Sequence, residues 1–298
     1  TETTKGKFIL RFFRSTKSED EINLLFSVLL YLHSLGFPVH KTISTKKGSL
    51  MLEVEVLERL IKVAIFNFLP GSHIKYEEIK EIHLQEIGRM LEDLHEALRQ
   101  FPPEKLLGLK SSQVNFQEEL EQTDVRLERN FSENYFLLSA GQINFFAQAW
   151  RNDREDLVAL SSKLETGESQ LIHTDIVTDN LLFVSDKISG ILDFDNMRMG
   201  LPLEDLAIVA SAWFLNAVEM DVVTCLSAII RSYKENYSLD EQMFIISFIR
   251  FYIWKQIVWA MGPSGTDYYA AVNRGSLKTF ERKYKELSLL KNDDIFTN

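Results

Sequence analysis

The chain has 298 residues, of which 45% are hydrophobic and 26% charged, as expected for a soluble globular protein with a sizeable core. A formal net charge of −10 argues against nucleic acid as the main partner and fits a cationic small molecule. The sole cysteine, Cys225, excludes an internal disulfide, so a reducing, cytoplasmic setting is expected. The longest apolar run, residues 206–218, is too short to span a bilayer, so no membrane partner is expected.

The first elements are a strand and a helix. Residues 8–13 alternate in side-chain direction, which predicts a strand with one cation, Arg11, set between apolar neighbours. A helix follows, since Ser18 and Glu21 stand in the arrangement of a capping box. Gly36 is expected to end this helix. The face that carries Arg11 also carries Ile9 and Phe13.

Two further strands are predicted over residues 49–57 and 60–69, and the dipeptide Pro70-Gly71 breaks the second. After this break the pattern changes, because apolar residues recur at spacings of three and four over residues 84–98. That spacing predicts an amphipathic helix. The change in pattern indicates a boundary near residue 70.

The rest of the chain is predicted to be mainly helical. Residues 112–164 carry few strand signals, and helices resume from about Glu204, with a short β segment at 171–193 in between. The predicted fold class is therefore α+β and bilobal. A small β-rich N-lobe is expected at residues 1–69, and a larger, mostly helical C-lobe at 70–298.

A β-hairpin is predicted within residues 181–192, where two strand-like stretches flank a turn signal. If the turn is centred between Asp186 and Lys187, Asn180 lies opposite Asp193. Directly opposed residues have Cβ atoms about 4.5–5.5 Å apart. An amide oxygen and a carboxylate would then converge at the mouth of the hairpin, which is a plausible seat for Mg²⁺.

Asp175 stands on the loop just before this hairpin, where a carboxylate could accept a proton from a substrate hydroxyl or orient it. The pattern His173-x-Asp175-x-x-x-x-Asn180 resembles the catalytic-loop motif of the aminoglycoside phosphotransferases and their relatives, which include choline, homoserine, methylthioribose and fructosamine kinases. The segment Leu192-Asp193-Phe194-Asp195 resembles the second motif of this family, the counterpart of the protein-kinase Asp-Phe-Gly.

The resemblance continues in order along nearly the whole chain. It implies a protein-kinase-like fold and the transfer of the ATP γ-phosphate to a hydroxyl of a small molecule. Three further segments carry it: Phe66-Asn67-Phe68-Leu69-Pro70-Gly71 resembles the hinge, Gly88-x-x-Leu91-x-x-Leu94-His95 the helix after it, and Gly200-x-Pro202-x-x-Asp205-Leu206-Ala207 the entry into a later helix.

The resemblance also implies roles for the residues that match. Asp175 would be the catalytic base. Asn180 and Asp193 would hold Mg²⁺. His173 would orient the catalytic loop rather than react, and Asp205 would brace that loop.

The nucleotide contacts follow from the same resemblance. Arg11 would take the place of the phosphate-binding lysine, and Glu21 would be either its helix partner or only part of the capping box. Asp195 would help to bind a second metal or face solvent. The adenine is expected between the lobes, against the backbone at Phe66, Asn67 and Phe68.

Three questions remain open at this stage. The glycine-rich loop and strand pair that precede the lysine strand in this family are expected to lie before Thr1. The acceptor is an aminoglycoside, a choline-like amino alcohol, homoserine or a sugar derivative. Because Arg11 is not a lysine and Glu21 has two readings, the alternative function is that of a pseudokinase, which binds nucleotide or acts as a scaffold without turnover.

The remaining aromatic and histidine residues are predicted to be structural. The histidines outside the catalytic loop show no spacing typical of metal ligands. His95 lies beside an apolar helix stripe, which predicts a buried and hydrogen-bonded side chain. Trp213, Trp254 and Trp259 lie in helical segments and are predicted to pack in the core, with a role in the acceptor site for one of them as the alternative.

Overall fold

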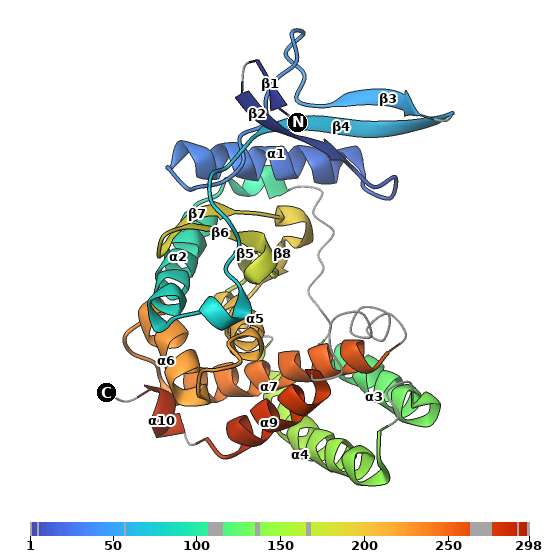
Figure 1. Cartoon of the computed structure of the whole chain (residues 1–298), viewed down its shortest axis with the longest axis vertical. Helices are drawn as coiled ribbons and strands as arrows, with labels where there is room; N and C mark the ends of the chain where they lie inside the picture. The colour runs from blue at the N-terminus through green and yellow to red at the C-terminus, as the bar shows by residue number, and fades with distance from the viewer. Residues whose placement is uncertain are drawn as a thin grey trace.

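The molecule has two parts, a small sheet with one helix beneath it and a larger, mostly helical part below (Figure 1). This is the bilobal α+β arrangement that the sequence predicts. The computed structural model describes residues 2–4, 6–56, 58–106, 116–134, 138–164, 168–262, 276–290 and 292–296. Two pieces of the predicted helical region, 112–115 and 135–137, lie outside these ranges.

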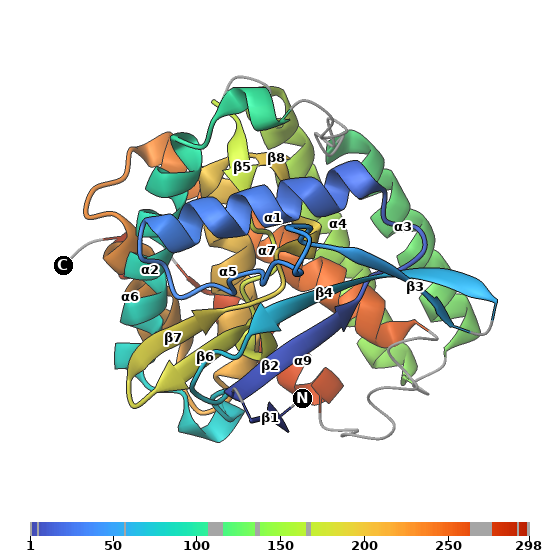
Figure 2. The ribbon, with the colours of Figure 1, turned by 90° about the horizontal axis from the view of Figure 1, so that it is seen from above.

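The upper lobe is an antiparallel sheet with the strand order β1-β2-β4-β3. Helix α1 packs against it (Figure 2). Across this contact the Phe26 and Phe66 ring centroids lie 6.2 Å apart. The Ser18–Glu21 capping box is present, and Gly36 follows the helix end with a φ of 89°, both as predicted. The bounds are β1 (Glu2–Thr3), β2 (Gly6–Phe12), α1 (Glu19–Ser34), β3 (Leu52–Val56) and β4 (Arg59–Asn67).

The lower lobe contains helices and two small two-stranded sheets. One sheet pairs β5 with β8, a strand that the sequence analysis did not predict. The helices are α2 (Glu81–Arg99), α3 (Phe116–Glu133), α4 (Ala140–Leu164), α5 (Pro202–Asn216), α6 (Val222–Tyr233), α7 (Leu239–Met261), α9 (Ser276–Ser288) and α10 (Asn292–Phe296). The strands are β5 (Gln170–Ile172), β6 (Leu181–Val184), β7 (Lys187–Ile191) and β8 (Arg198–Gly200). Short 3-10 helices cover Tyr76–Glu78, Pro103–Leu106, Thr178–Asn180 and Phe194–Asn196.

Helix α5 lies at the centre of the lower lobe. Every residue from Glu204 to Phe214 is buried, and the helix packs against α6 and α7. A helix that is apolar on all sides is stable only when other elements surround it. Its first turn carries the buried carboxyl groups of Glu204 and Asp205, so these two charges are held in a fixed place.

Helix α7 is long and apolar enough to cross a membrane by length and composition alone, whereas the sequence analysis considered only residues 206–218. Its most apolar window is 56% buried, and the helix packs against α5 and α4, as a core helix does. Trp213 and Trp254 are fully buried, which confirms their predicted core role. The prediction for Trp259 was wrong, because this side chain is 45% exposed on the outer face of α7.

The predicted hairpin is present, but its register differs by two residues next to the turn and by one residue beyond the bulge. The turn is formed by Ser185 and Asp186, and a β-bulge shifts the pairing between Leu182 and Phe183. As a result the N–H of Leu192 donates to the carbonyl of Asn180 at 2.9 Å. The prediction that Asn180 lies directly opposite Asp193 was therefore wrong. The observed pairs are Leu181 with Ile191, Leu182 with Gly190, Phe183 with Ile188 and Val184 with Lys187.

The segment between the lobes is attached to this hairpin. Ser72 forms an antiparallel bridge with Phe183, and the Ser189 hydroxyl donates to the carbonyl of Pro70 at 2.7 Å. Gly71 has a φ of 116°, and a Cβ there would lie 2.3 Å from Ser189 Oγ. Only glycine satisfies both conditions. The strands β6 and β7 are thereby fixed beneath the upper lobe (Figure 1).

Helices α2 and α6 approach closely at Gly88, where an added Cβ would lie 2.3 Å from the carbonyl oxygen of Ile229. We expect Gly88→Ala to lower the free energy of unfolding by about 1–3 kcal/mol, because α6 must move to admit the methyl group. Urea titration followed by circular dichroism measures this loss. Gly141→Ala in α4 is the control, since its methyl would meet only Ser139 Oγ, at 3.9 Å. Similar losses in both variants would contradict the prediction.

Candidate active site

The loop that begins at His173 is held by one buried carboxylate. Asp205 Oδ2 accepts a hydrogen bond from the His173 N–H at 2.9 Å, and its Oδ1 accepts from the Thr174 N–H at 2.9 Å. His95 Nε2 lies 3.0 Å from Asp205 Oδ2. His95 is buried and hydrogen-bonded, as the sequence predicts. The contacts of Asp205 are those of a brace for this loop.

Asp205 is ionised despite full burial. Burial raises the pKa of Asp205, but the hydrogen bonds that the carboxylate accepts from the His95 ring and from the His173 backbone outweigh this effect, so the pKa falls below the ordinary 3.8. A buried carboxylate is tolerated when donors satisfy it, and here three of them converge on it.

His173 connects the loop to the strand that leads to Asp193. Its Nδ1 accepts a hydrogen bond from the Asp175 N–H at 3.2 Å, so the ring proton is on Nε2, which donates to the Leu192 carbonyl at 3.0 Å. Burial lowers the pKa of His173 although nearby Asp205 opposes this, so the ring is neutral. These contacts orient the loop and place no reactive atom of His173 in solvent.

Asp175 is partly buried next to this ring. Burial raises the pKa of Asp175 above 3.8, the charge of Asp193 adds to the rise, and the hydrogen bond from Asn196 opposes it. Asn196 Nδ2 donates to Asp175 Oδ2 at 3.2 Å, and the Thr174 hydroxyl donates to the Asn196 carbonyl at 2.9 Å. Asn196 therefore orients the carboxyl group, a role that the sequence analysis missed.

Asn180 and Asp193 reach the same space in spite of the shifted register. Asn180 Nδ2 donates to the Asp175 carbonyl at 2.8 Å, which leaves its Oδ1 as the group that can act as a ligand. Asp193 has a left-handed backbone, with φ 56° and ψ 63°, and its side chain is 43% exposed. The left-handed conformation of Asp193 turns the backbone away from the direction of β7, so the side chains of Asn180 and Asp193 line one cavity.

This cavity of about 290 Å³ lies between the two lobes. Four of the predicted site residues line it: Arg11, Phe66, Asn180 and Asp193. The sequence analysis missed the others, which are Ile9, Leu25, Leu29, His40, Leu192 and Phe194. A signal existed for Ile9, because it shares the strand face of Arg11, and for Leu25 and Leu29, which lie on the apolar stripe of α1.

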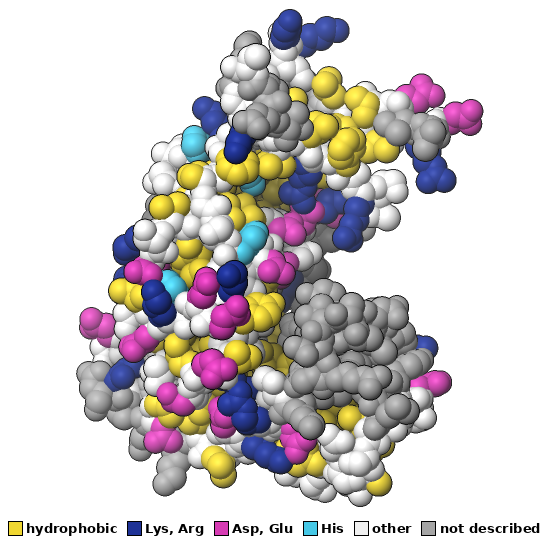
Figure 3. All heavy atoms as spheres, in the orientation of Figure 1, with side chains coloured by type: hydrophobic (Ala, Val, Ile, Leu, Met, Phe, Trp, Pro, Cys, Tyr) yellow, Lys and Arg dark blue, Asp and Glu magenta, His cyan; other side chains and the backbone are white. Residues whose placement is uncertain are grey.

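Arg11 is the upper-lobe member of an ionic cluster. Its Nη2 lies 3.4 Å from Asp193 Oδ1 and 2.5 Å from Asp195 Oδ2. Lys17 Nζ lies 3.1 Å from Asp195 Oδ1 and donates to the Asp195 carbonyl at 3.0 Å. Asp195 is therefore held between two cations, which corrects one of its two expected roles, that of simply facing solvent. Basic and acidic side chains lie side by side at this hollow between the lobes (Figure 3).

Of the two readings for Glu21, the capping box is observed. Its carboxylate accepts hydrogen bonds from the Ser18 N–H at 2.7 Å and the Ser18 hydroxyl at 2.8 Å. The carboxylates that pair with Arg11 in this structure come from the lower lobe, at Asp193 and Asp195.

The three predicted hinge residues differ in their surroundings. Phe66 is buried and forms a wall of the cavity, whereas Phe68 is 46% exposed. The Asn67 N–H donates to the Lys41 carbonyl at 3.1 Å, and its side-chain oxygen accepts from the Lys41 N–H at 2.6 Å. His40 Nδ1 lies 2.9 Å from the Asn67 carbonyl. The polar groups of Asn67 thus hold the strand end together.

The oxygen ligands present suit a hard cation. Within the described ranges no group of three or more His, Cys, Asp or Glu side chains is arranged to hold a metal ion. The pair Asn180 and Asp193 does offer an amide oxygen and a carboxylate at one cavity. Such a pair fits Mg²⁺, which uses few protein oxygens and keeps its other positions for water and phosphate.

Comparisons with known proteins concern the family and the fold of the chain. The model of the phosphotransferase enzyme family matches residues 1–237. A homoserine kinase of Bartonella henselae is 29% identical over 214 residues, which are 71% of this chain and only 59% of that protein. An aminoglycoside phosphotransferase structure from Alicyclobacillus acidocaldarius is similar over 96% of this chain and 87% of its own, with a TM-score of 0.69 and 14% identity. The amicoumacin kinase hAmiN, in complex with AMP-PNP, Ca²⁺ and Ami, is similar over 95% and 82%, with a TM-score of 0.62 and 15% identity. The two structures share the bilobal kinase-like fold with this chain.

The brace at Asp205 generates a stability prediction. We expect Asp205→Asn to lower the free energy of unfolding by about 3–5 kcal/mol, because the new amide would face backbone N–H donors within a buried network. Urea titration at neutral pH measures the loss. Asp156→Asn is the control, since its side chain is 68% exposed, and we expect a change within about 0.5 kcal/mol.

The same variant has a pH signature. Because folding lowers the pKa of Asp205, its carboxylate contributes stability above 3.8, and this contribution is lost as the pH falls through the folded pKa. The stability difference between the native chain and Asp205→Asn should therefore shrink in acid. A difference that is the same in acid as at neutral pH would contradict the assignment.

Proposed function

The chain belongs to the phosphotransferase enzyme family, and on that premise we propose that it transfers the γ-phosphate of ATP to a hydroxyl group of a small molecule. One observation carries the proposal. Arg11 from the upper lobe and Asn180 and Asp193 from the lower lobe line one cavity, and Asn180 is hydrogen-bonded to the backbone of Asp175. We assign residues 1–69 to nucleotide binding and residues 70–298 to catalysis and acceptor binding.

ATP with Mg²⁺ would supply the phosphoryl group and neutralise its developing charge. Asn180 Oδ1 and the Asp193 carboxylate would hold the metal, and Arg11 would contact the phosphates. Phe66 would form an apolar wall for the base near the strand end. The complex of amicoumacin kinase with AMP-PNP and Ca²⁺ supports the use of a nucleotide and a divalent metal here.

Asp175 would accept the proton of the acceptor hydroxyl. Because Asn196 donates a hydrogen bond to Asp175 Oδ2, we assign Asp175 Oδ1 as the atom that would accept the proton of the acceptor hydroxyl. The raised pKa of Asp175 makes it a better base than an exposed carboxylate. His173 and Asp205 would act on Asp175 only by positioning the loop. Asp195 would hold Arg11 and Lys17 in place until phosphate arrives.

We place homoserine first among the acceptors to test, because the Bartonella henselae relative is a homoserine kinase. A choline-like amino alcohol, an aminoglycoside and a sugar derivative follow. The net charge of −10 favours acceptors that carry an amine. The buried free thiol of Cys225 suits a reducing compartment, so we assign the reaction to the cytoplasm.

Two variants separate chemistry from binding. We expect Asp175→Asn to bind Mg·ATP as the native chain does and to lose kcat by about 10²–10⁴-fold, because only the base is removed. Asp193→Ala should lose the Mg²⁺-dependent part of nucleotide binding as well. Calorimetric titration of ATP with and without Mg²⁺, followed by single-turnover phosphorylation of homoserine, measures both. Nucleotide binding without turnover on any acceptor of the panel would instead identify a pseudokinase.

The pH profile tests Asp175 independently. Since its pKa is raised above 3.8, the log of kcat/KM should fall on the acid side through that raised pKa, as the base becomes protonated. Initial rates across the stable pH range measure the profile. Asn196→Ala removes the hydrogen bond that favours the ionised form, so it should move the acid limb to higher pH. An acid limb that does not move would argue against Asp175 as the titrating base.

A further inference from the structure

One polar residue of the cavity between the lobes has no role in the proposed phosphoryl transfer. Of the ten residues that line this cavity, six are apolar and four are polar. The polar residues are His40 and three that are assigned to the phosphates and the metal, namely Arg11, Asn180 and Asp193. His40 is therefore the polar side chain of this lining that is left to contact another part of a bound nucleotide.

The backbone on each side of His40 is attached to a different lobe. Val39 forms a parallel bridge with Ile191 of β7, and Thr42 forms an antiparallel bridge with Phe66 of β4. The His40 ring lies against the Phe66 ring, with the two centroids 5.7 Å apart. These contacts fix the imidazole at the end of β4, beside the apolar wall that we assign to the base.

The surroundings of the His40 ring determine which of its nitrogens can accept a hydrogen bond. Nδ1 lies 2.9 Å from the Asn67 carbonyl oxygen, and because a carbonyl only accepts, Nδ1 carries the proton. Burial lowers the pKa of His40 below 6.5 and the charge of Arg11 adds to this, although the hydrogen bond to Asn67 opposes it, so the ring is neutral at neutral pH. Among the residues that the structure describes, the ring has no second hydrogen-bond partner. Nε2 is therefore an acceptor that is left for a ligand.

A neutral acceptor at this place suits a nucleobase rather than a phosphate. Phosphate oxygens are acceptors themselves, so no proton would lie between them and Nε2 of His40. The 6-amino group of adenine is a donor, whereas the 6-oxygen of guanine is an acceptor. The Nε2 atom can therefore distinguish the two kinds of purine at one position of the ring.

The spacing along β4 separates this ring from the phosphate-binding cation. Arg11 is paired with Ala64, whereas His40 contacts Phe66 and Asn67, which are two and three residues farther along the strand. At the rise of a β-strand this is about 7–10 Å. The two polar side chains thus stand at separate points of one strand, as contacts to the base and to the phosphates of one nucleotide require.

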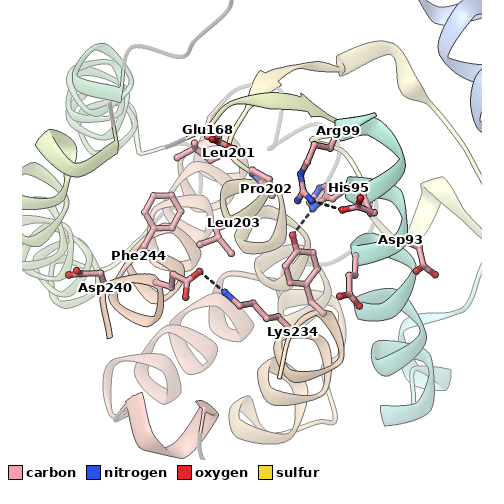
Figure 4. A pocket seen from close by; sticks show the side chains of 14 residues that line it. Asp93, His95, Arg99, Glu168, Leu201, Pro202, Leu203, Lys234, Asp240 and Phe244 are labelled. Atoms are coloured by element: carbon pink, nitrogen blue, oxygen red, sulfur yellow. Dashed lines mark hydrogen bonds and ion pairs between the residues drawn. The ribbon is translucent and has the colours of Figure 1, made fainter. Parts of the chain in front are cut away.

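The larger cavity of the lower lobe does not suit a nucleotide. It measures about 1010 Å³, and Figure 4 shows the side chains that line it. Six of these side chains are carboxylates, and the two cations of the lining are paired with them, Arg99 with Glu96 and Lys234 with Glu241. An acidic lining repels a polyphosphate, so we expect the nucleotide in the cavity between the lobes.

We propose that His40 is a specificity-determining residue of the nucleotide site, because its Nε2 accepts a hydrogen bond from the 6-amino group of adenine. The side chain thereby selects adenine nucleotides over nucleotides of 6-oxo purines. This assignment rests on the proposed function, since a nucleotide must occupy the cavity for the ring to contact its base.

Three nucleoside diphosphates that differ at the 6-position test the selection in the native chain: ADP, IDP and the diphosphate of purine riboside. Diphosphates carry no γ-phosphate, so calorimetric titration with Mg²⁺ measures binding alone. Purine riboside has only hydrogen at the 6-position, so we expect its diphosphate to bind about tenfold more weakly than ADP. IDP should bind more weakly still, because two acceptors would face each other. Equal affinities of ADP and IDP would overturn the role of His40 and leave nucleotide binding intact, whereas no binding of any of the three would overturn the proposed function as well.

A pair of histidine variants tests the residue. His40→Leu removes the acceptor, and His73→Leu is the matched control, because His73 Nδ1 also lies 3.0 Å from a carbonyl, that of Leu181, but the ring is outside this cavity. Both variants are checked first for a native melting transition. We expect His40→Leu to weaken ADP binding about tenfold and to bring the affinities of ADP and IDP to similar values, and His73→Leu to keep the native preference. A native preference for ADP in His40→Leu, or the same loss of preference in both variants, would overturn the proposal.

Nitrogen NMR of the native chain tests the contact without a substitution. In isotope-labelled protein, with the His40 signals assigned through the backbone, we expect a protonated Nδ1 and an unprotonated Nε2. ADP with Mg²⁺ should shift the Nε2 signal in the direction of an acceptor that gains a hydrogen bond, and IDP should not. A proton on Nε2 in the free chain, or the same response to ADP and IDP, would overturn the proposal.

Discussion

The buried charge of Asp205 is the interaction on which the site depends. A fully buried carboxylate is costly unless donors satisfy it, and here those donors are the backbone of His173 and Thr174 and the ring of His95. Because α5 is buried on all sides, its first turn cannot shift without disturbing the core of the lower lobe. The position of Asp175 is therefore set by the packing of a central helix, through one charged group, rather than by the loop itself.

The motif residues could be predicted from sequence because they stand at the ends of short strands, and strand ends bring side chains together whatever the detailed register. The register itself could not. The turn holds Ser185 at a φ of 56°, a left-handed conformation that a serine in the sequence does not predict. The bulge lies where a Cβ on Gly190 would come within 2.9 Å of the Leu182 side chain. The packing between the two strands determines the register of the hairpin, and no local sequence pattern predicts it.

The sequence analysis missed other residues for a different reason, because their roles arise from long-range contacts. Lys17 meets Asp195, which is 178 positions away in the chain, and the pattern around Lys17 indicates only the approach to a helix. Asn196 has its role because Asp193 turns the backbone into the left-handed region and brings the following 3-10 helix towards Asp175. Propensity and periodicity describe neighbours in sequence, so contacts of this kind become visible only when the lobes are assembled.

The ionic cluster between the lobes has a consequence for the order of ligand binding. Arg11 and Lys17 balance Asp193 and Asp195, so the four side chains together carry no net charge. A divalent cation that joined this group alone would leave an excess of two positive charges in a partly buried place, whereas a cation accompanied by polyphosphate would not. Electrostatic neutrality therefore makes the metal and the anion promote each other's binding. Their binding also involves the ion pairs of Arg11 with Asp193 and Asp195, which are its only described ionic contacts and connect the two lobes.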